Sequence, residues 1–154
     1  MNVESVVLAA LKADAGAGGF KTLLTGGVYA FVETGRLGIG RKGTPDAFDA
    51  DGLLKPCAVV KARGAVPDGG ADDDGAQVAS YRQVVEIWLY ADGDDALTAM
   101  EAAQKRAFSV LHGKMIGTSK VIAHWAGNYF GGERDASLDF ALVLRCDYAV
   151  RAMV

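Results

Sequence analysis

Two segments in the second half of the chain alternate apolar and polar residues so regularly that they constrain the fold more than any other feature. In residues 83–90 (QVVEIWLY), every second residue from Val85 to Leu89 is aliphatic, and the residues between them include charged and aromatic types. Residues 138–148 (LDFALVLRCDY) alternate over their whole length. Because successive side chains of a strand leave on opposite faces, this pattern predicts two half-buried strands.

A long amphipathic helix is predicted between these strands, over residues 94–112. Asp94 or Asp95 can cap its start, and Gly113 suits the left-handed position after its end. Apolar residues recur at helical spacing, which indicates one buried stripe facing the sheet. The residues expected in this stripe are Leu97, Met100, Ala103, Ala107, Phe108 and Leu111.

The remaining elements complete an α+β fold. A first helix is expected after a cap at Asn2, and short strands are expected over residues 28–33, 57–63 and 120–125. Residues 127–135 are interpreted as a connection, and long loops are expected at about 34–55 and 65–79. Short connections between strands favour antiparallel pairing. We therefore predict one domain over residues 1–154, with a four- to five-stranded, mostly antiparallel sheet and two helices packed on one face.

Composition excludes several classes of function. The 16 Lys and Arg residues against 19 Asp and Glu residues give a net charge of −3, which disfavours binding of nucleic acid through a basic surface. No apolar run approaches the roughly 18 residues of a membrane helix, so no membrane partner is expected. The two cysteines, Cys57 and Cys146, lie in predicted strands and are expected to be buried thiols in a reducing cytoplasm.

No motif predicts catalysis or a cofactor. Residues 38–43 (GIGRKG) match G-x-G-x-x-G formally, but Thr44-Pro45 follows instead of the helix that would receive a pyrophosphate. His112 and His124 lack further ligands at metal-binding spacing. The expected catalytic, cofactor-binding and metal-binding residues are therefore none, and we predict a protein that is not an enzyme. Other residues weighed and rejected on the same grounds are Asp72, Asp73 and Asp74 as a calcium loop, and Ser109 and Ser137 as nucleophiles.

Three sets of residues are candidates for contacts with other molecules. The sheet face opposite the helices carries Trp88 and Tyr90 among charges, and this mixture suits either a protein interface, where aromatics are enriched, or a solvated face. Two loops of opposite charge are expected to be exposed, and they either pair with one another between subunits or are simply solvated. The sheet-face residues are Glu86, Trp88, Tyr90, Asp139, Arg145 and Asp147; the basic loop holds Arg36, Arg41 and Lys42; the acidic tip holds Asp68, Asp72, Asp73 and Asp74.

The order of these elements resembles the tail-completion, or tail-terminator, proteins of long-tailed bacteriophages and related gene-transfer particles. The resemblance covers most of the chain and rests on element order and hydrophobic pattern. It is carried by a helix that ends in a glycine-rich stretch, a proline-led strand and two long alternating strands around the second helix. The segments concerned are Gly27-Val28-Tyr29, residues 54–60 (LKPCAVV), residues 81–90 (YRQVVEIWLY), the helix from Asp95 to Leu111, and residues 136–150.

The resemblance implies a virion structural protein that is assembled in the bacterial host cytoplasm and ends up at the tail–neck junction. Such a protein forms a ring of identical subunits, expected to be a hexamer, which stops growth of the tail tube and joins it to a neck or head-completion protein. Genomic DNA would only pass through the lumen. Two alternatives remain open: a head-completion or neck connector protein, and a cytosolic α+β oligomer with a ligand-binding or regulatory role.

Overall fold

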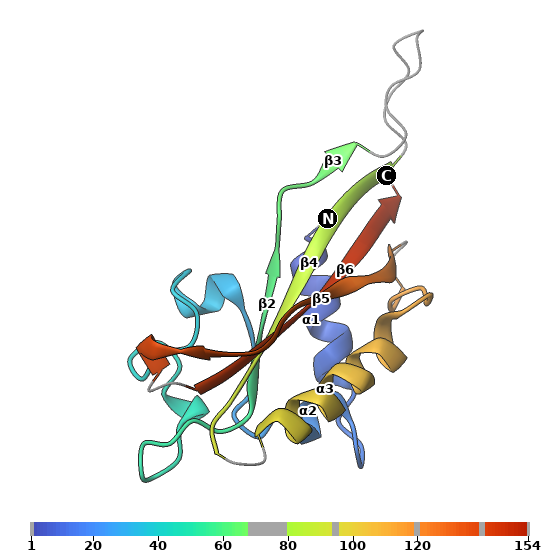
Figure 1. Cartoon of the computed structure of the whole chain (residues 1–154). Helices are drawn as coiled ribbons and strands as arrows, with labels where there is room; N and C mark the ends of the chain where they lie inside the picture. The colour runs from blue at the N-terminus through green and yellow to red at the C-terminus, as the bar shows by residue number, and fades with distance from the viewer. Residues whose placement is uncertain (1, 68–79, 94–95, 119–120, 139–140, 154) are drawn as a thin grey trace, which may run out of the picture.

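The computed structural model describes residues 2–67, 80–93, 96–118, 121–138 and 141–153. A single sheet separates a layer of helices from a layer of short turns, which lie on its opposite face (Figure 1). The helices and strands are α1 (Val3–Ala13), α2 (Phe20–Leu23), β1 (Val28–Ala30), β2 (Cys57–Ala62), β3 (Val66–Pro67), β4 (Ser80–Ala91), α3 (Ala96–Leu111), β5 (Val121–Asp135) and β6 (Ala141–Met153).

The sheet has the strand order β1-β2-β4-β6-β5, and the two-residue strand β3 also pairs with β4. Among the strands of the described residues, β1 and β2 pair parallel and the other pairs are antiparallel. The predicted α+β class and the mostly antiparallel sheet are thus confirmed. At the centre, Ile87 of β4 lies opposite Cys146 of β6, and Val85 lies opposite Tyr148. All four are buried in the core between sheet and helices.

The helix layer is held together at one carboxylate. Asp14, which follows α1, accepts two hydrogen bonds of 2.6 Å from the guanidinium of Arg106 on α3. It also accepts one of 2.7 Å from the backbone N–H of Phe20, at the start of α2. The hydrogen bond from Arg106 is the main reason that the pKa of Asp14 lies below its usual value. One side chain therefore ties three helices together.

The cap of α1 and the glycine after α3 follow the prediction, but the buried stripe of α3 is rotated. Asp94 and Asp95, the expected caps at the start of α3, lie outside the described residues. The side chain of Asn2 accepts a hydrogen bond from the backbone N–H of Ser5, as an N-cap should, and Gly113 has a positive φ of 69°. The expectation that Leu97 and Phe108 are buried was wrong, because they are 45% and 43% exposed. Small residues let the helix approach the sheet closely, so its buried side is Ala96, Met100, Ala103, Ala107 and Leu111.

The segment predicted as a long loop forms a second, smaller layer. It contains a 3-10 turn at Pro45–Ala47 and lies on the sheet face opposite the helices (Figure 1). Its apolar side chains pack on that face. The expected strand over residues 28–33 ends at Ala30, because the chain turns into a 3-10 helix at Phe31–Thr34. The buried residues of this outer cluster are Ile39, Ala47, Leu54, Cys57, Val59, Leu138 and Ala141.

The last two strands are longer than predicted. Residues 127–135 were expected to connect two strands, but they belong to β5, which pairs with β6 as far as Asp135. The register between β5 and β6 shifts at three places, so this edge strand is irregular. Gly127 sits at the first shift with a φ of 120°, a conformation that glycine adopts readily. The glycines that looked like a loop therefore mark bulges. The predicted strand from Leu138 begins instead at Ala141.

The burial of α3 predicts different costs for two truncations on the same helix. Leu111 is completely buried, so Leu111→Ala should lower the free energy of unfolding by about 2–5 kcal/mol. Phe108→Ala should lower it clearly less, because the Phe108 ring is 43% exposed. Chemical denaturation followed by circular dichroism measures both. Equal losses for the two variants would show that the helix is rotated from the orientation described here.

Candidate functional site

Four ionised side chains gather on the sheet face opposite the helices. We call this set, Arg63, Glu86, Arg145 and Asp147, the charge cluster. Arg145 donates to both carboxylate oxygens of Asp147, at 2.9 and 3.1 Å. Arg63, just past β2, donates from Nε to Glu86 at 2.7 Å, and its Nη2 lies 3.8 Å from Asp147. The neighbouring strands β4 and β6 thus place two carboxylates between two guanidinium groups.

The charge cluster is mostly removed from water. Glu86, Arg145 and Asp147 are 4%, 9% and 2% exposed, whereas the side chain of Arg63 is 46% exposed. Both sequence-based interpretations, an open interface and a solvated face, were therefore wrong for these three residues; Asp139 lies outside the described residues. Burial by itself would raise the pKa of Glu86. Hydrogen bonds from Arg63 and Trp88 and the charge of Arg145 outweigh burial, so the pKa is lowered.

Beside the charge cluster lies an aromatic patch, which we define as Phe31, Leu37, Trp88 and Tyr90. These residues line a hollow of about 140 Å³ together with Gly38, Val59 and Lys61. The indole N–H of Trp88 donates to Glu86 at 3.1 Å, and the guanidinium of Arg145 lies 5.2 Å from the centre of its ring. The candidate residues Trp88 and Tyr90 are thus brought together, half-buried, with Trp88 held in place by charged neighbours.

Within the basic loop, the three cations differ in how they are held. Arg41 donates to the carbonyl of Gly52 at 3.2 Å and lies 5.0 Å from the centre of the Phe48 ring. Arg36 and Lys42 are exposed, and no ion pair joins either to another described residue. Arg36 has a φ of 62°, a left-handed conformation that is strained for a residue with a side chain. The acidic tip, Asp68, Asp72, Asp73 and Asp74, lies outside the described residues.

A third surface, which the sequence did not reveal, lies where α3 meets the edge strand β5. We call it the α3–β5 cleft; it has a volume of about 170 Å³ and is lined by Gln104, Lys105, Phe108, Trp125 and Tyr148. The Phe108 ring stacks on His112 at 4.4 Å between centres and meets Trp125 edge-on at 6.4 Å. The feature of the sequence that could have indicated this cleft is Phe108, an aromatic residue at the edge of the predicted apolar stripe of the helix.

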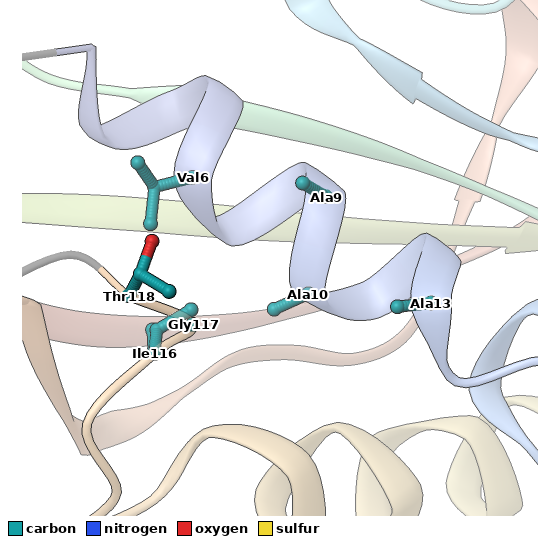
Figure 2. Close-up of a pocket in the computed structure, with 7 residues that line it drawn as sticks. All are labelled: Val6, Ala9, Ala10, Ala13, Ile116, Gly117 and Thr118. Carbon is teal, nitrogen blue, oxygen red and sulfur yellow. The ribbon is translucent and has the colours of Figure 1, made fainter.

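An open groove of about 310 Å³ runs between α1 and the segment that follows α3. Figure 2 shows Val6 of α1 and Thr118 facing one another across it, with Ala10 and Ala13 further along the helix. The residues that line this groove are mostly small and apolar. The groove therefore offers shape and apolar area to a partner, but almost no polar group that could select one.

The described residues include no cluster of metal ligands, and both thiols are buried. Among them, no group of three or more His, Cys, Asp and Glu side chains could hold a metal ion. Burial raises the pKa of the thiols of Cys57 and Cys146 to about 12, so both are protonated and unreactive at neutral pH. Among the helices of the described part of the chain, none is long and apolar enough to cross a membrane.

Comparisons with known proteins give a likeness to a solved structure. No protein-family model matches the chain, and no curated protein matches it either. Among solved structures, a chain from "Virion of native gene transfer agent (GTA) particle" matches with a TM-score of 0.56 and 17% sequence identity. The match covers 99% of this chain and 93% of that chain. At this identity the likeness establishes a shared fold over nearly the whole length of both chains.

The lowered pKa of Glu86 leads to a prediction for pH. A carboxylate whose folded pKa lies below its ordinary value of 4.5 contributes stability above that pH, and the contribution is lost as the pH falls through the folded pKa. At neutral pH, Glu86→Gln should lower the free energy of unfolding by about 1–3 kcal/mol. It removes the carboxylate that accepts from the half-exposed Arg63 and leaves Asp147 as the carboxylate shared by Arg63 and the buried Arg145. The gap in melting temperature between wild type and Glu86→Gln should therefore narrow below pH 4.5.

A suitable control is Asp51→Asn, which removes an exposed carboxylate on the same side of the sheet. Its melting temperature should follow that of the wild type across the same pH range. If the gap between wild type and Glu86→Gln stays constant from pH 7 down to pH 3, Glu86 does not stabilise the fold through its charge.

Proposed function

We propose that this chain is a structural subunit of a phage-like particle, a one-domain tail terminator. In this role its copies form a ring, expected to be a hexamer, that ends the tail tube and joins it to a neck or head-completion protein. The observation that carries the proposal is the fold shared with a chain of a gene transfer agent virion over 99% of this chain. The resemblance in element order to tail-terminator proteins supports the finer assignment.

The surfaces of the subunit suit a closed ring. Contacts in a ring are heterologous, so each subunit needs two different surfaces that meet head to tail. The aromatic patch lies on the sheet face opposite the helices, whereas the α3–β5 cleft lies on the helix side at the strand edge. Both expose aromatic or aliphatic side chains, which are enriched in protein interfaces. An interface role needs no catalytic group, in agreement with the proposed absence of enzymatic activity.

The test of this function is assembly with and without a tail tube protein. Native mass spectrometry of the purified protein should show a closed ring, with six copies as the expected number. When the protein is added to polymerising tail tube protein, electron microscopy should show shorter tubes with a ring at one end. A ring that ignores the tube but binds a portal-side protein would favour the neck connector. A small oligomer that ignores both would favour a cytosolic regulatory role.

The acidic tip is proposed to act in the ring, either toward a neighbouring subunit or toward the lumen. Facing a neighbour, its carboxylates would pair with Arg36, Arg41 or Lys42, and the contact would weaken with salt. Facing the lumen, they would repel phosphates and let DNA slide past. Replacing Asp72, Asp73 and Asp74 by Asn should slow ring closure in the first case. In the second case it should leave the ring intact and reduce the infectivity or transfer activity of particles.

A control with the same loss of charge keeps this comparison fair. Asp46→Asn, Asp51→Asn and Glu101→Gln remove three exposed carboxylates at other places on the subunit. This variant should assemble like the wild type. If the acidic-tip variant also matches the wild type in both ring formation and particle activity, neither placement of the tip is correct.

A further inference from the structure

We propose that the subunits of the ring meet when Leu37 of one copy enters the α3–β5 cleft of the next. This inference rests on the proposed ring and names its contact. The occupant of the cleft is a second copy of this chain. Three features of the subunit support this contact: the way Leu37 is held out into solvent, the hydrogen-bonding groups left unused around the cleft, and the chemical match between the two.

Leu37 is an apolar side chain that the fold holds out into solvent. It is 89% exposed, the largest exposure among the large hydrophobic residues described. The turn that carries it is fixed rather than loose, because Thr34, itself buried, donates to the carbonyl of Phe31 at 2.6 Å and accepts from the backbone N–H of Gly38 at 3.0 Å. The strained φ of Arg36 belongs to the same turn. Backbone strain retained around an exposed leucine points to an interaction outside the subunit.

The α3–β5 cleft contains polar atoms that the subunit leaves unused. Tyr148 is completely buried, and its hydroxyl finds no hydrogen-bond partner among the described residues. The side-chain nitrogen of Gln104 is likewise buried without a partner of ordinary geometry; this amide lies beside the thiol of Cys146, a weak acceptor. Both residues line the cleft, but both atoms are covered in the single subunit, so a partner reaches them only when the covering rings move. Because buried polar groups are nearly always hydrogen-bonded, the unpaired hydroxyl of Tyr148 calls for a partner.

The cleft and the Leu37 turn are chemically complementary. The cleft supplies donors: the amide of Gln104, the hydroxyl of Tyr148 and the ammonium of Lys105 at its margin. The turn supplies an acceptor, because the backbone carbonyl of Leu37 accepts no hydrogen bond from the backbone of another described residue. The leucine side chain would pack between Phe108 and Trp125, which are 43% and 46% exposed, and these rings must part to admit it.

The relative position of the two surfaces favours a ring over a symmetric pair. The aromatic patch, which includes Leu37, and the helix-side cleft lie on opposite faces of the sheet, so one copy can use both at once with different neighbours. Contacts of this kind continue head to tail, and they close into a ring when the rotation between copies allows it. The apolar groove of Figure 2 is a weaker receptor for Leu37, because it has no unsatisfied donor among its described lining residues.

Cysteine cross-linking tests the contact directly. In a Leu37→Cys/Lys105→Cys double variant, mild oxidation or a short bis-maleimide reagent should join neighbouring copies. The native Cys57 and Cys146 are buried and do not interfere. Denaturing gels should then show a ladder that rises to the ring number. A Leu53→Cys/Lys105→Cys variant is the control, since Leu53 is 56% exposed in the same layer but outside the aromatic patch; it should give at least about tenfold less cross-linked product.

A second pair of variants separates assembly from folding. Tyr148→Phe removes the unpaired hydroxyl, so the melting temperature of the subunit should stay unchanged or rise. The same change should weaken the ring, and the protein concentration at which half of the subunits are assembled should therefore increase. Leu37→Asp should abolish the ring at concentrations at which Leu37→Met still forms it. Tyr148→Phe and Leu37→Asp rings that assemble like the wild type would overturn the proposal.

The outcomes distinguish this contact from the proposed function. A ring that caps tail tubes but gives no ladder would overturn the contact and leave the function standing. A ladder up to a closed ring that never affects tail tubes would leave the contact standing and overturn the tail-terminator role. A chain that remains monomeric with and without tail tube protein would overturn both.

Discussion

The antiparallel pairing of β4 with β6 is the constraint on which the rest of the structure depends. Its register runs from Ser80 opposite Met153 to Ala91 opposite Leu142, so two long alternating strands are locked residue by residue. A slip of the register by one residue would move the side chains of one strand to the opposite face of the sheet relative to its partner strand. It would then turn Glu86 toward the helices and Ile87 toward the charge cluster. The alternation and the register therefore specify each other, and both layers are built on this pair.

Because of this pairing, the sheet is covered on both faces but in different ways. The helix side is an apolar core fixed at its rim by Asp14 and Arg106. The opposite side combines a small apolar cluster with the charge cluster, in which Glu86, Arg145 and Asp147 are buried and Arg63 is half-exposed. Buried ion pairs add little net stability, but removing one partner costs a great deal. The charge cluster therefore acts mainly as a device for positioning, and it holds Trp88 in the aromatic patch through Glu86 and Arg145.

The sequence predicted the elements that depend on local pattern and missed those that depend on distant contacts. The alternation around Val85 and the cap at Asn2 are local, and the structure confirms both. The exposure of Phe108 was missed because the small residues of α3 decide how the helix rolls on the sheet. The ion pairs of Arg63 were missed because its carboxylate partners lie far along the chain. The unsatisfied groups of the α3–β5 cleft leave no trace in the sequence.

The irregular edge of β5 has a consequence for how copies of this chain can associate. An exposed edge strand presents unpaired backbone groups with which a strand of another molecule can form hydrogen bonds, and such pairing commonly starts aggregation. Here the segment after α3 occupies the first part of that edge, through bonds such as Gly113 to Ala123 at 2.8 Å. Beyond Trp125, the repeated register shifts break the regular spacing that a new strand would need. Extension of the sheet from copy to copy is thereby discouraged, and a filament by that route is disfavoured relative to an assembly of limited size built on side-chain contacts.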